Sequence, residues 1–105
     1  MRKSRILVLG IPVLLICLQT ALAQHNFKPP AGYVPDERTA VAVAEAILIP
    51  IYGADNIRTE RPFRATLRGK IWVVEGTLPT GMVGGVALVE ISKEDGRVLR
   101  VIHGK

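Results

Sequence analysis

The sequence predicts an α+β domain in which one N-terminal helix packs on a four-stranded antiparallel meander sheet. Apolar residues with helical spacing between residues 36 and 53 predict one helix with a buried face. Further on, apolar and polar residues alternate with a period of two over residues 63–76 and 86–104, which predicts two β-hairpins. A helix on one face of the sheet is the arrangement that buries both apolar surfaces.

The first 23 residues have the three parts of a secretory signal peptide. A basic start, Met1–Arg5, is followed by an apolar run over Ile6–Leu18 and by a small-x-small ending, Ala21–Ala23. We expect cleavage after Ala23 and a periplasmic or secreted protein. An alternative is a lipid attached to Cys17, but the large Ile16 before it disfavours this.

Residues 24–105 make up the expected mature chain of 82 residues. The prolines of residues 24–35 predict an extended lead-in, and residues 36–105 form a single domain. Loss of three basic residues with the signal leaves 11 basic against 9 acidic residues, a formal charge of +2. This near-neutral chain without basic runs is not expected to bind nucleic acid, nor a membrane once the signal is removed. It has no cysteine for a disulfide or thiol chemistry.

The predicted helix begins after Asp36, a good N-cap residue, and Pro50 bends or ends it, with Gly53 as the stop. Its expected buried face consists of Ala40, Val43, Ala44, Ile47, Leu48 and Ile51. The back is also apolar, at Val41, Ala42, Ala46 and Ile49. Either these residues are tolerated at the surface, or the helix has a second packing surface. The polar residues 54–61 predict a loop.

The first hairpin is predicted to turn at Gly69-Lys70, with glycine first as in a type II′ turn. This register pairs Leu67 with Trp72, Ala65 with Val74 and Phe63 with Gly76, all on the helix side. It also places Arg64 opposite Glu75 on the other face.

The second hairpin is predicted to have a three-residue loop with Gly96 in a left-handed bulge. This loop pairs Ile91 with Leu99, Val89 with Val101 and Glu90 with Arg100. The helix side of the sheet then consists of Phe63, Leu67, Trp72, Val74, Val89, Ile91, Leu99 and Val101.

The far face of the sheet is the candidate partner-binding surface. It carries Ile71, Val73, Leu88, Val98 and Ile102 among charged residues. An uncovered apolar patch of this kind marks an interaction site; alternatively, Phe27 and Tyr33 of the lead-in cover part of it. Met82, in the glycine-rich segment 77–85, is a further candidate because methionine adapts to partner surfaces.

The mature chain carries no set of residues that suggests catalysis. His103 lies near the C-terminus, the remaining serine, Ser92, lies next to a turn, and His25 lies in the lead-in. We expect no enzyme activity, no cofactor and no metal site. A pocket containing His103 and a buried carboxylate would favour an enzyme after all.

Several segments resemble a family of bacterial immunity proteins encoded beside polymorphic toxins. They are Tyr33–Asp36, Ala44–Ala46, Ile49–Gly53, Pro62-Phe63, Ala65–Leu67, Trp72–Pro79, Gly84–Val86, Ile91–Arg100 and His103–Lys105. The resemblance implies a nuclear-transport-factor-two-like or cystatin-like fold. It also implies a chain that neutralises a cognate toxin by contact, with no catalytic residues to carry over.

The leading hypothesis is therefore an exported immunity-type protein that binds a toxin or another hydrolase, through the far sheet face, the loop 79–85, or both. A propeptide-like or structural module that forms a homodimer is the alternative. A small exported enzyme is the third hypothesis.

Overall fold

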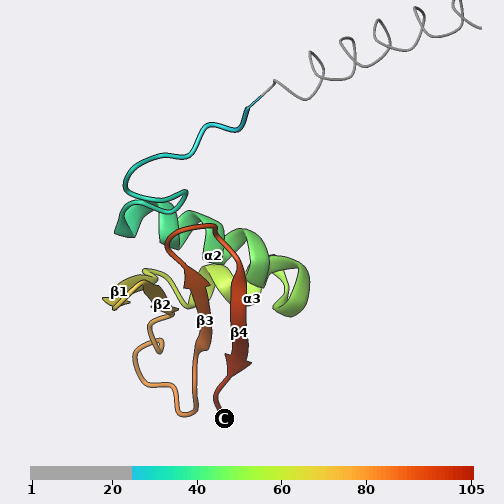
Figure 1. Cartoon of the computed structure of the whole chain (residues 1–105). Coiled ribbons are helices and arrows are strands. Elements are labelled where there is room, and N and C mark those ends of the chain that lie inside the picture. Colours follow the sequence, from blue (N-terminus) through green and yellow to red (C-terminus); the bar gives the residue numbers. More distant parts are fainter. Residues whose placement is uncertain (1–24) are drawn as a thin grey trace, which may run out of the picture.

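The computed structural model describes residues 25–105, so the predicted signal peptide, its cleavage point and Cys17 lie outside the described residues. The elements are α2 (Glu37–Tyr52), α3 (Ala54–Thr59), β1 (Arg64–Arg68), β2 (Ile71–Glu75), β3 (Ala87–Ser92) and β4 (Val98–His103). All strand pairs are antiparallel, in the order β1-β2-β3-β4. The predicted helix on a meander sheet is confirmed (Figure 1). Neither helix within residues 25–105 is long and apolar enough to cross a membrane.

Helix α2 begins and ends at the predicted residues. The Asp36 carboxylate accepts a hydrogen bond from the Thr39 N–H at 2.8 Å, and Gly53 ends the helix with a φ of +92°. Pro50 lies inside the last turn without ending the helix. The buried face is centred on three residues: Ala40, Ala44 and Leu48.

Two expectations for the sides of α2 need correction or refinement. Ile51, predicted to be buried, is 54% exposed, because Ile57 of α3 fills the core at this end of the helix instead. On the back, Ala42 and Ala46 are exposed, whereas Val41 and Ile49 pack against the margin of the core.

The loop predicted over residues 54–61 is wrong, because residues 54–59 form the short helix α3. The sequence signal for this helix is weak, because only Ile57 is buried and the remaining residues of the helix are polar or small. Asp55 and Arg58 form an ion pair one turn apart at 2.8 Å. The helix turns the chain back toward the sheet. Glu60, the residue after it, therefore contacts Ala87 of β3 and His103 of β4.

The first hairpin has the predicted register, with Leu67 opposite Trp72, Ala65 opposite Val74 and Arg64 opposite Glu75. However, Arg64 pairs with Glu37 of α2 at 3.1 Å. Leu67, expected to be buried on the helix side, is 43% exposed because β1 is an edge strand.

The second hairpin follows the prediction except next to its turn. Val89 lies opposite Val101 and Glu90 opposite Arg100, but Ile91 lies opposite Val98, with a bulge beside Glu90. The predicted Ile91–Leu99 pair is therefore wrong, because a bulge adds one residue to β4 and leaves Leu99 unpaired and exposed. Gly96 has the left-handed φ of +75° that the turn requires.

The lead-in is attached to the β3–β4 turn. Tyr33 and Val34 donate backbone hydrogen bonds to the carbonyls of Glu94 and Lys93, each at 3.0 Å. Trp72, buried as predicted, donates its indole N–H to the Val34 carbonyl at 2.8 Å. Phe27 stays largely exposed. The lead-in thus contacts the end of the sheet, at its β3–β4 turn.

Candidate functional site

The outer face, meaning the sheet face opposite α2, carries a row of apolar side chains. The register places Leu88 between Ile102 on β4 and Glu75 on β2, and places Val73 opposite Glu90. Ile71, Val73 and Leu88 are half-buried by their neighbours, and Ile102 is 39% exposed. The helices pack on the other side, where Trp72, Val74, Val89 and Ile91 are buried. Four of the six predicted binding residues therefore share one face.

Val98 and Met82 have other positions. Val98 lies opposite the buried Ile91, so the register no longer aligns it with the outer row, although it is exposed at the edge. Met82 lines a hollow beside α3. Met82 thus lies in the loop as predicted, whereas Val98 differs because the sequence does not indicate which residue the β3–β4 bulge leaves unpaired.

Charged residues lie among the apolar side chains of the outer face. Glu90 and Arg100 lie directly opposite each other, with 3.9 Å between their carboxylate and guanidinium atoms. Such an exposed pair contributes little to stability, about 0–1 kcal/mol. Apolar side chains mixed with charged ones are a composition that protein-binding surfaces have.

A hollow of about 500 Å³ opens between α3, the end of β4 and the loop after β2. Exposed apolar side chains of the loop, Leu78, Met82 and Val83, form one wall. Tyr52, Glu60 and His103 supply ionisable groups on the other walls.

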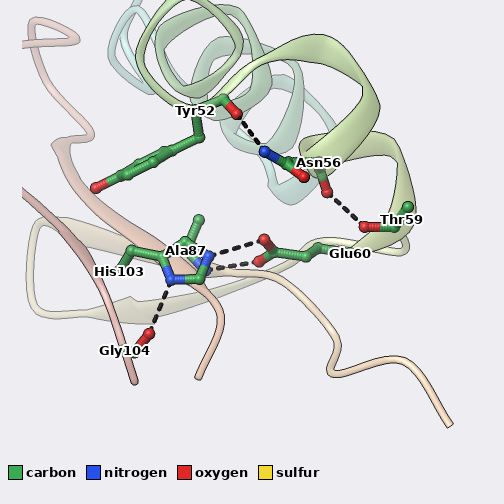
Figure 2. Close-up of polar contacts among 7 residues, drawn as sticks. All are labelled: Tyr52, Asn56, Thr59, Glu60, Ala87, His103 and Gly104. Carbon is green, nitrogen blue, oxygen red and sulfur yellow. Dashed lines mark hydrogen bonds and ion pairs between the residues drawn. The ribbon is translucent and has the colours of Figure 1, made fainter. Parts of the chain in front are cut away.

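Glu60 and His103 form the central polar contact of this hollow (Figure 2). One Glu60 oxygen accepts the buried Ala87 N–H at 2.7 Å, and the other lies 2.9 Å from Nε2 of His103. The Glu60 side chain is 8% exposed and that of His103 is 33% exposed. The Tyr52 ring lies over the imidazole, with the ring centres 5.1 Å apart. The pair thus joins the end of α3 to both β3 and β4.

The contacts of His103 define its protonation state. Its Nδ1 lies 2.8 Å from the Gly104 carbonyl oxygen, and its Nε2 faces a carboxylate. Both partners can accept hydrogen bonds, so this geometry favours the cationic imidazole, in which both ring nitrogens donate. The hydrogen bond to Glu60, and secondly that to Gly104, raise the pKa of His103 above its ordinary value of 6.5. Only the neutral form of this ring, which is populated above its raised pKa, has a lone pair for general-base catalysis.

Sequence reasoning did not find Glu60. The residue lies in the segment taken for a loop, 43 positions before His103, and only α3 brings the two together. The spacing of Ile57 and Glu60, three residues apart, was the available signal that one helical face points inward.

The model of a family described as NTF2 fold immunity protein matches residues 39–105, from the first turn of α2 to the end of the chain. The chain belongs to this family. The resemblance in the sequence and the α+β fold are thereby confirmed. The description of this family is that of immunity proteins.

Two curated relatives come from Escherichia coli (strain K12). The chain is 40% identical over 73 residues to the uncharacterized protein YhhH, and 38% identical over 73 residues to the uncharacterized protein YbbC. The alignments cover 69% of this chain and 58% and 60% of the relatives, so the chain spans about three fifths of their length. No solved structure matches.

Proposed function

We propose that this immunity protein is exported and neutralises a cognate toxin by direct contact, without chemistry of its own. The composition of residues 1–23 supports export. An exported antidote implies a toxin that acts outside the cytoplasm, such as a hydrolase of the cell wall.

The outer face is the proposed contact surface, and the observation that carries this proposal is its uncovered apolar row. Leu88 and Ile102 lie opposite each other by register, and Val73 lies diagonally from Leu88 on the same face. In residues 25–105, helix α2 packs on the other face of the sheet. Burial of this row against a partner contributes about 25 cal/mol for each Å² removed from water. Met82 and its loop form a second contact at the margin of the hollow.

An enzyme is the second candidate, because the hollow combines His103 with the buried carboxylate of Glu60. The two candidates make opposite predictions for His103→Gln. A contact mechanism keeps neutralisation, because glutamine also donates a hydrogen bond to Glu60. A mechanism that uses the imidazole as a base loses it.

The experiment is affinity capture of the toxin from the native host by the tagged protein, followed by titration calorimetry with the purified partner. Val73→Asp and Ile102→Asp place a charge in the apolar row, and each is expected to weaken binding at least tenfold. Ile51→Asp is the matched control, since Ile51 is an exposed isoleucine at the end of α2, away from the sheet.

Circular dichroism and thermal melting of each variant separate lost binding from lost folding. Binding that survives both outer-face substitutions would overturn the proposed surface. A purified toxin that is inhibited at substoichiometric amounts of this protein would overturn the contact mechanism and favour catalysis.

A further inference from the structure

The sheet has two edge strands, and β1 is protected against pairing with another strand. Glu37 of α2 accepts the outward N–H of Ala65 at 3.1 Å, so a side chain already occupies one of the edge donors. The strand also carries Arg64 and Arg68 in its five residues. A covered donor and charged side chains are the usual means of keeping an edge unpaired.

Within residues 25–105, the other edge, β4, has no side chain bonded to its outward donors, and its bulge lies at the N-terminal end, next to Leu99. Its six residues, Val98–His103, include four aliphatic side chains, and Val98, Leu99 and Ile102 are each about 40% exposed. Helix α2 packs mainly across β1, β2 and β3, and it contacts β4 where the Tyr52 ring lies over His103. The single arginine, Arg100, is held near Glu90 of the neighbouring strand.

The backbone of β4 has free hydrogen-bonding groups at its outer side. Gly104 donates its N–H to the Val86 carbonyl at 3.1 Å, so the even-numbered residues of this segment bond to β3. By alternation, Val101 and His103 direct their backbone N–H and C=O groups away from the sheet. Among residues 25–105, no backbone group bonds to them there.

We infer that β4 pairs with β4 of a second copy of this chain, antiparallel and centred on Val101, to give a continuous eight-stranded sheet. In this register the two Val101 residues lie opposite each other, and Leu99 lies opposite His103 of the second copy. Arg100 lies opposite Ile102, so no like charges oppose each other directly. At β1 the outward residues are Ala65 and Leu67, and the Ala65 N–H is already bonded to Glu37, which favours pairing at β4.

The assembly leaves both outer faces open on one side of the joined sheet. The proposed dimer is a property separate from toxin neutralisation, and its formation does not depend on toxin binding. A dimer without toxin binding, and toxin binding by a monomer, are separate results.

The test is sedimentation equilibrium of the full chain, expressed with its own N-terminal segment, over the widest concentration range in which it stays soluble. We expect a concentration-dependent shift to twice the monomer mass. Leu99→Lys, which places a second cation beside His103 across the axis, is expected to give a monomer. Val101→Pro removes an outward donor that no strand of the same chain uses, and is expected to do the same.

Leu67→Lys is the matched control, because Leu67 is an equally exposed leucine on the β1 edge. It should remain dimeric, with all variants showing the wild-type circular dichroism spectrum. A wild-type monomer at every concentration would overturn the inference and leave β4 free for a strand of the toxin. A dimer unaffected by both β4 variants would place the interface elsewhere.

Discussion

Replacing Glu60 separates two contributions that this carboxylate makes to folding. In Glu60→Ala, the buried Ala87 N–H loses its acceptor at 2.7 Å, which costs about 1–3 kcal/mol in the free energy of unfolding. His103 also loses its partner, but its side chain is one-third exposed, so this loss is about 0–1 kcal/mol. Glu60→Gln keeps an oxygen for Ala87 and loses the ion pair. We therefore expect Glu60→Ala to be the less stable variant by about 1–3 kcal/mol.

The ion pair also makes stability depend on pH. The pKa of His103 is raised in the folded protein, so its contribution is fully present below the ordinary value of 6.5. The contribution is lost as the pH rises through the folded-state pKa, which lies above 6.5. His103→Gln should remove this dependence, and its deficit relative to wild type should shrink as the pH increases.

Urea unfolding followed by circular dichroism, at pH values on both sides of this transition, measures both effects. Equal stabilities of Glu60→Ala and Glu60→Gln would refute the role of the buried Ala87 contact. A pH profile of the wild type that coincides in shape with that of His103→Gln would refute the ion pair.

Two further predictions concern the core and the lead-in. Leu48→Ala removes a fully buried side chain of α2 and should lower the free energy of unfolding by about 2–5 kcal/mol, whereas a value under 1 kcal/mol would show that this helix face is not packed as described. Trp72→Phe deletes the 2.8 Å hydrogen bond to the Val34 carbonyl, so we expect a loss of about 1 kcal/mol and faster proteolysis of residues 25–34, and an unchanged cleavage rate would contradict the attachment of the lead-in.

The sheet could be predicted from the sequence because two independent patterns agree. In the first hairpin, the Gly69-Lys70 turn and the apolar alternation of Ala65, Leu67, Trp72 and Val74 define the same register, and the structure has it. In the second hairpin, the bulge could be anticipated from Gly96, but not which residue it leaves unpaired. Leu99 and Val98 are both aliphatic, so alternation alone does not distinguish them.

The candidate site could be predicted only in part. The outer row follows from period two, because its residues are local to the strands. The Glu60–His103 pair depends on α3, whose polar sequence resembles a loop and which is held by a single buried side chain, Ile57. The only periodic signal for this contact is the three-residue spacing of Ile57 and Glu60, which is too short to distinguish a helix from a loop.

The most direct test of neutralisation through the outer face is a protection assay with the toxin that affinity capture identifies. The toxin is exported in a sensitive host with the wild-type chain, with the Val73→Asp/Ile102→Asp double variant, or with Ile51→Asp. If the outer face binds the toxin, the host survives with the wild-type chain and with Ile51→Asp, and dies with the double variant. Survival with a folded double variant, or death with the wild-type chain, would contradict neutralisation through the outer face.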